Sequence, residues 1–145
     1  MGSSGPERQP MPQPTTLPPR NLSLTALAVF LLLWLCAAAR HALLQSNAYD
    51  LGLFDQWIWL LSRGLPPLSS MEGVHVLADH GAWMLYGAAL PYRLAANVQW
   101  LLASQAAALS FTALPLWWVA RQAGLSSKLC WLACGLWWLQ PVVFN

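Results

Sequence analysis

The chain has 145 residues, of which 57% are hydrophobic and only 8% charged, and its net charge is +2. Soluble domains carry about 25% charged residues, so this composition excludes a soluble globular protein and indicates a membrane protein. A net charge this small gives no support for nucleic acid as a partner.

Residues 1–20 are rich in proline and have no apolar periodicity. Such a segment cannot bury enough surface to offset the entropy cost of ordering it, so we expect a disordered tail. The uncharged residues 22–39 follow, and as a helix they are long enough to cross a bilayer. A signal peptide cleaved after the alanines at 37–39 is the alternative, but the long leader and the later apolar segments favour an uncleaved anchor.

Three more apolar segments follow, at residues 81–95, 98–120 and 129–144. Polar residues within them should face neighbouring helices, because they are costly against lipid. We therefore predict an all-α polytopic membrane protein, in which residues 21–145 form about four transmembrane helices. The basic residues divide three to four between the two sides of this topology, so the positive-inside rule leaves its orientation open.

The connection from Arg40 to His80 carries four of the five carboxylates and all three histidines. Connections of this length in compact proteins are usually functional. Within it, residues 51–63 place apolar and polar side chains on opposite halves of a helical wheel. This division predicts an amphipathic helix in the membrane interface, which Gly64 ends.

Candidate functional residues surround this predicted helix. Asp50 precedes it and fits either an N-cap or a general base at the membrane boundary. Asp55 lies on the polar face beside Gln56 and is either a solvated charge or a second acid of the site. Asp79 and His80 stand before the second span, where they either cap a helix or bind a cation or phosphate. No metal-ligand spacing is recognised, so the metal stays unknown and a divalent cation is only a candidate.

The string YDLGLFDQ at residues 49–56 is the most specific motif of the chain. With the later residues it resembles a bacterial family of predicted membrane proteins, domain-of-unknown-function family 2079, from about residue 40 to the end. The later residues that carry the resemblance are Trp59, Gly64, Asp79, His80, Pro91, Gln105, the run ALPL at 113–116, Ala120 and Arg121.

That family is in turn distantly similar to the C-type glycosyltransferases, polytopic enzymes that take sugar from a polyprenyl-phosphate carrier. The resemblance implies a protein of a bacterial inner (plasma) membrane with its first loop outside the cytoplasm. It implies catalytic roles for Asp50, as the base, and Asp55, and it gives Arg63 or His80 as groups that offset the charge of the leaving phosphate. The substrate-binding residues it implies are Gln56, Arg63, Asp79 and His80.

The chain resembles only the N-terminal part of such enzymes, which are several times longer. We therefore expect it to be inactive alone, either as a truncated product or as the partner of a second polypeptide that completes the fold. The alternative is a non-enzymatic membrane subunit or structural protein whose first loop docks on a partner. A transporter fragment is a weaker option, since no carboxylate lies inside a predicted span.

Overall fold

The computed structural model describes residues 17–46, 48–79 and 82–140, and these contain helices but no β-strand. The prediction of an all-helical protein is thereby confirmed. The helices are α1 (Arg20–Ala42), α2 (Ala48–Ser62), α3 (Val76–Asp79), α4 (Met84–Leu94), α5 (Gln99–Phe111), α6 (Ala113–Gln122) and α7 (Ser127–Trp138).

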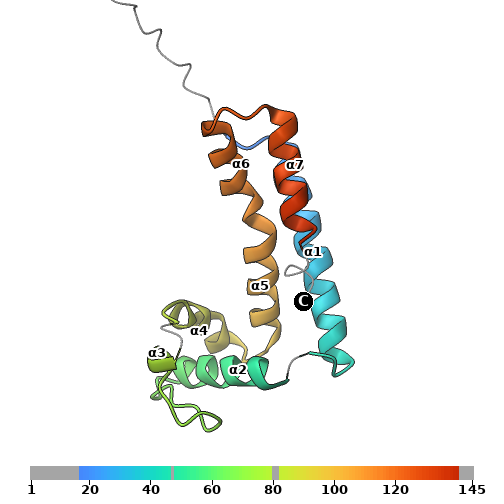
Figure 1. Cartoon of the computed structure of the whole chain (residues 1–145). Coiled ribbons are helices and arrows are strands. Elements are labelled where there is room, and N and C mark those ends of the chain that lie inside the picture. Colours follow the sequence, from blue (N-terminus) through green and yellow to red (C-terminus); the bar gives the residue numbers. More distant parts are fainter. Residues whose placement is uncertain (1–16, 47, 80–81, 141–145) are drawn as a thin grey trace, which may run out of the picture.

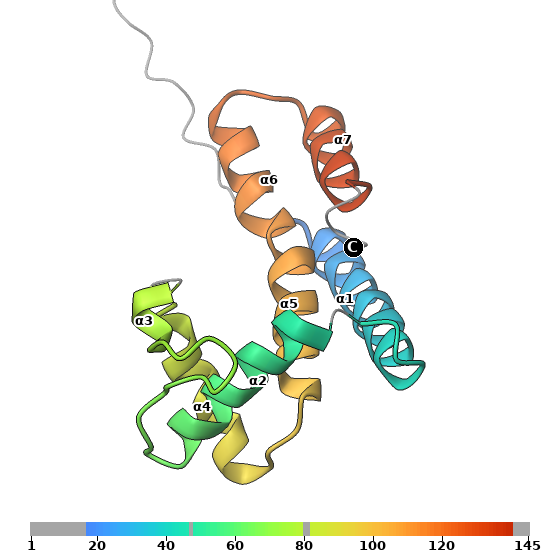
Figure 2. The same ribbon diagram turned by 60° about the horizontal axis from the view of Figure 1, so that its bottom comes forward.

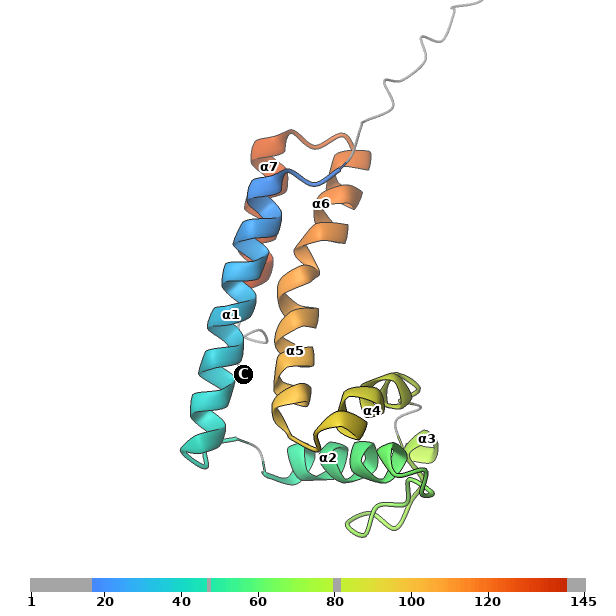
Figure 3. The same cartoon turned by 180° about the vertical axis from the view of Figure 1, so that it is seen from behind.

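Helices α1, α5, α6 and α7 form an elongated bundle, and α2, α3 and α4 form a layer across one end of it (Figure 1). Helix α1 runs antiparallel to α5 and α6, as the view from behind shows (Figure 3). Leu22 at its start packs with Trp117 of α6. Towards its other end, the indole N–H of Trp34 donates to Gln99 Oε1 at the start of α5, at 3.2 Å.

Helix α1 extends the predicted first span by two residues at its start and three at its end. It passes unbroken through the alanines at 37–39 and packs against α5 and α6. The anchor and the cleaved signal peptide both stay predictions. Leu24, Leu32 and Leu35 are each more than half exposed and form a surface suited to lipid.

The third predicted span is divided into α5 and α6 at Thr112. Pro115 explains the division, because it has no N–H to donate to the carbonyl of Phe111 and so interrupts the helical hydrogen bonds. The two helices nevertheless continue in nearly one direction (Figure 1). Together they form a segment of 24 residues, Gln99–Gln122.

Helix α7 closes the bundle against α1 and α6. Cys130 and Cys134 lie on its buried face and are fully enclosed by this core. The indole N–H groups of Trp137 and Trp138 donate to backbone carbonyls of α5, at 2.9 and 3.1 Å. These bonds join α7 to the bundle just before the division between α5 and α6.

Within the described part of the chain, two helical segments have the length and composition to cross a membrane. They are α1, with a mean hydropathy of 2.4, and Gln99–Gln122, with 1.2. Helices α4 and α7 contain 11 and 12 residues, fewer than the roughly 20 that a span needs. Four spans therefore stay a prediction. Residues 80–81 and 141–145, which belong to the second and fourth predicted spans, lie outside the described residues, as does the predicted tail up to residue 16.

Helix α4 lies beside α2 in the end layer, away from α6 and α7 (Figure 2). With α4 in this layer, Arg93 lies at the same end of the bundle as Arg40 and Arg63. The described basic residues divide three to three, and orientation stays open. One end holds Arg40, Arg63 and Arg93, and the other holds Arg20, Arg121 and Lys128.

Helix α2 extends from residue 48 to residue 62, against the predicted 51–63. Gly64 terminates it with a φ of 70°, a left-handed conformation that costs glycine little. The N–H of Gly64 bonds to the carbonyl of Leu61 and that of Leu65 to the carbonyl of Leu60, at 3.1 and 3.0 Å. This is the hydrogen-bond pattern of a Schellman motif.

Candidate functional site

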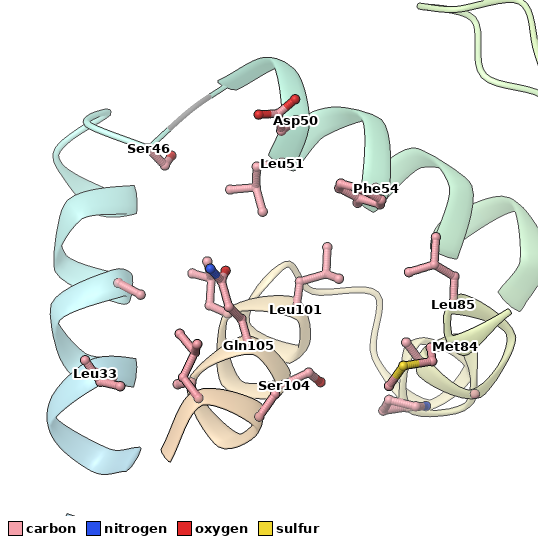
Figure 4. Close-up of a pocket in the computed structure, with 18 of the residues that line it drawn as sticks. Leu33, Ser46, Asp50, Leu51, Phe54, Met84, Leu85, Leu101, Ser104 and Gln105 are labelled. Carbon is pink, nitrogen blue, oxygen red and sulfur yellow. The ribbon is translucent and has the colours of Figure 1, made fainter. Parts of the chain in front are cut away.

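A cavity of about 1180 Å³ lies where α1, α2, α4 and α5 meet (Figure 4). Most of its lining is apolar, with Leu33 from α1, Phe54 from α2, Met84 from α4 and Leu101 from α5. Its volume is large enough for a drug-sized ligand or a length of lipid chain. The polar residues that line it are Arg40, Ser46, Asp50, Ser104 and Gln105.

Asp50 lies inside the first turn of α2 and not at the N-cap position expected for it. That position falls near residue 47, outside the described residues. The N-terminus of α2 still stabilises the carboxylate, because a negative charge in the first turn interacts favourably with the helix dipole. Asp50 is exposed and lines the cavity beside Leu51 and Phe54 of the same helix. Its surroundings thus combine a helix terminus, an apolar cavity and solvent.

Arg40 lines the same cavity as Asp50, although it was predicted only to begin the first loop. It lies in the last turn of α1, where a cation is favoured by the helix dipole. In the sequence Arg40 is distinguished only as the first charge after the uncharged run 22–39, ten residues before Asp50, and this does not indicate a shared cavity. The structure therefore brings one cation and one anion to the rim of a mostly apolar space.

Asp55 does not share this cavity. Its Oδ1 accepts a hydrogen bond from the phenol of Tyr92 on α4, at 2.6 Å. Asp55 lines a smaller neighbouring space of about 400 Å³, together with His41 and with Ser46, which lines both spaces. The five helical steps from Asp50 to Asp55 add up to a rotation of about 140° beyond one full turn, which puts the two carboxylates on different faces of α2. The structure does not bring the two predicted catalytic acids together.

Tyr92 is only 2% exposed. Burial, followed by the hydrogen bond to Asp55 and the negative charge of that carboxylate, raises the pKa of Tyr92 well above its ordinary value. Each cause disfavours the phenolate, because the charged form is harder to bury and repels the carboxylate. The phenol therefore stays a hydrogen-bond donor throughout the physiological pH range.

A titration tests this state of Tyr92. We expect wild-type protein and Y92F to show equal phenolate absorbance up to about pH 11, beyond the ordinary pKa of about 10. The pKa of Tyr92 is higher in the folded chain than in the unfolded chain, and this difference links the stability of the fold to pH. The hydrogen bond to Asp55 stabilises the fold fully below about pH 10, and this stabilisation is lost as the pH rises through the pKa of the folded state. Greater absorbance in the wild type than in Y92F at about pH 11 would contradict this assignment.

The side chain of Gln56 forms hydrogen bonds with two serines in the loop between α2 and α3. Its Nε2 donates to Ser70 Oγ at 2.8 Å, and its Oε1 accepts from Ser69 Oγ and from the N–H of Ser70, at 3.2 and 3.1 Å. Ser69 is itself 2% exposed, and its Oγ accepts from the N–H groups of Met71 and Glu72. The predicted substrate-binding side chain thus holds the loop between α2 and α3 against α2.

The other predicted binding residues are not gathered around Asp50. Arg63 follows α2 at its far end, about 20 Å from Asp50 along the helix axis, with its guanidinium carbon 6.0 Å from the ring centroid of Trp59. Asp79 ends α3, but the structure does not describe its side chain, and His80 lies outside the described residues. Among the described residues, no three His, Cys, Asp or Glu side chains lie close enough to hold a metal.

Comparison with known proteins gives a family. A family whose description reads Predicted membrane protein (DUF2079) matches residues 40–145. No curated protein and no solved structure matches the chain. The matched residues include α2, α4 and α5, three of the four helices around the cavity, and cover more than two thirds of the sequence. The chain therefore belongs to the DUF2079 family of predicted membrane proteins.

Proposed function

We propose that this chain is the N-terminal part of a membrane glycosyltransferase-like protein, which moves sugar from a polyprenyl-phosphate donor to an acceptor hydroxyl outside the cytoplasm. The supporting observation is the cavity of about 1180 Å³, which is mostly apolar and carries Asp50 and Arg40 at its edge. A polyprenyl-phosphate sugar has the matching division into an apolar chain, an anionic phosphate and a polar sugar.

In this proposal the acceptor hydroxyl transfers its proton to the carboxylate of Asp50 while its oxygen attacks the anomeric carbon of the sugar. The bond between that carbon and the phosphate oxygen breaks, and the phosphate leaves with the electron pair. The guanidinium of Arg40 donates hydrogen bonds to the phosphate and offsets its growing charge. Arg63 lies at the far end of α2 and takes no part.

The alternative of a non-enzymatic subunit is supported by a different observation. Asp55 and Gln56 form their hydrogen bonds with Tyr92, Ser69 and Ser70, as purely structural residues do. Under this alternative the cavity is a docking surface for a further helix, and Asp50 only stabilises the start of α2. The two functions therefore differ in whether the cavity binds a lipid phosphate.

Binding of undecaprenyl phosphate to the purified protein in detergent tests the proposal. Trp83 lines the cavity, so its fluorescence should respond to the ligand, and W83F identifies its share of the signal. We expect R40Q to raise the Kd about 10- to 100-fold, because it removes charge-assisted hydrogen bonds to the phosphate.

R63Q is the matched control, since it removes the same charge from a residue that does not line the cavity. It should change the Kd by no more than about twofold, as expected of an exposed charge. Undecaprenol, which lacks the phosphate, should bind R40Q and wild type equally. Absence of saturable binding, or equal effects of R40Q and R63Q, contradicts the proposal and favours the subunit.

A further inference from the structure

Helices α2 and α4 are two walls of the same cavity. Asp50 and Phe54 line it from α2, whereas Met84, Gly87 and Pro91 line it from α4. The position of α2 along α4 therefore sets where Asp50 stands relative to the opposite wall. Any contact that fixes these two helices against each other also fixes the geometry of the site.

The contact between α2 and α4 combines apolar packing with a hydrogen bond. Ile58 of α2 packs against Ala89 and Tyr92 of α4, and all three are buried. Apolar packing is non-directional, so by itself it tolerates small shifts of one helix along the other. The bond from the phenol of Tyr92 to Asp55 Oδ1, at 2.6 Å, is directional and restricts the register of the two helices.

The hydrogen bond lies close to the site on both helices. Tyr92 directly follows Pro91, which lines the cavity. Asp55 lies five residues after Asp50, about 7.5 Å along the same helix. A displacement at Asp55 is therefore carried to Asp50 by the intervening helix, since a helix moves as a rigid element over this distance.

We propose that Asp55 is a positioning residue for Asp50 and not a second catalytic acid: by accepting the hydrogen bond of Tyr92, it fixes α2 against α4. This inference rests on the proposed function, and it changes the role that the family resemblance gives to Asp55. Its chemical requirement is an acceptor oxygen rather than a negative charge. The raised pKa of Tyr92 agrees with a permanent donor in this pair. His41, which lines the small cavity with Asp55, is the titratable neighbour from α1.

The two possible roles of Asp55 differ in what they require. Positioning through Tyr92 requires only an acceptor oxygen, whereas catalysis as a base requires a carboxylate. D55N keeps an acceptor oxygen and cannot take up a proton as a base, whereas D55L and Y92F each remove one half of the hydrogen bond. We expect D55N to keep the transfer rate and the Kd for undecaprenyl phosphate within about twofold, and D55L and Y92F to lose at least about tenfold in transfer. The double variant D55L/Y92F should lose no more than either single variant, because both remove the same bond.

A distance measurement gives a readout that needs no activity. Spin labels at W59C on α2 and L90C on α4, both exposed positions, report the register of the two helices in a background that carries C36A. The distance distribution should be narrow in the wild type and D55N, and broad or shifted in D55L and Y92F. Recovery of folded protein by gel filtration is the control for each variant.

The outcomes are distinct. Loss of transfer in D55N with an unchanged narrow distribution shows chemistry at Asp55 and overturns the inference. Equally narrow distributions in all variants overturn it as well, because the bond then fixes nothing. If D50N leaves transfer unchanged while the distances follow the expected pattern, the proposed function fails and the positioning of α2 by Asp55 stands.

Discussion

D50N is expected to lower the rate of sugar transfer by about 10²- to 10⁴-fold, the range that a general base contributes. Asn has nearly the size of Asp and keeps a polar group at the cavity, but it cannot accept the proton of the acceptor hydroxyl. The measurement is transfer of radiolabelled sugar from a panel of polyprenyl-phosphate sugars in native membranes, where any second polypeptide that completes the fold is present.

The same substitution five residues further along α2 is the matched control. D55N removes an equal charge from the same helix and should leave transfer within about twofold of the wild type, because its amide oxygen still accepts from Tyr92. Immunoblotting of the membrane fraction shows whether both variants insert equally. Unchanged transfer in D50N removes Asp50 from the mechanism and leaves the non-enzymatic subunit as the better account.

A large side chain at residue 87 is expected to weaken binding of undecaprenyl phosphate by about 5- to 150-fold, since overfilling an occupied space costs about 1–3 kcal/mol. Gly87 lies on α4 and lines the cavity, and a Cβ added there meets no other atom within 4 Å. G87F therefore extends into the cavity without a clash at its own backbone. Fluorescence titration with undecaprenyl phosphate measures the effect.

G135F separates loss of the cavity from a general effect of enlarging a helical glycine. Gly135 lies on α7, outside the cavity, and a Cβ there also meets nothing within 4 Å. Both substitutions improve helix propensity by a similar amount, so both proteins should fold. Equal Kd values for G87F, G135F and the wild type place the ligand elsewhere and contradict the assignment of the cavity.

Hydropathy and helical periodicity predicted those parts of the fold that are decided locally. The uncharged run before Arg40 and the glycine after α2 are signals that act within a few residues. The second predicted span shows the limit of this reasoning, because an apolar helix that packs on a neighbour has the same composition as one in lipid. Tertiary contacts with α2, such as those of Ala89 and Tyr92, place α4 in the end layer.

The candidate site depends still more on tertiary structure. Asp50 was found through its motif, but its surroundings include α4 and α5, which lie far along the chain. Arg40 was missed because membership of a cavity has no local sequence signature. Asp55 and Gln56 belong to the same motif, and their hydrogen bonds with Tyr92 and Ser69 show that proximity in sequence does not imply a shared role.

The two indoles of α7 have a consequence for how this protein tolerates mutation. Trp137 and Trp138 donate to main-chain oxygens, which persist whatever side chains α5 carries at those positions. These hydrogen bonds thus depend on the side chains of α7 and not on those of α5. Sequence drift on α5 leaves the acceptors in place, while loss of either tryptophan has no simple compensation from the facing helix.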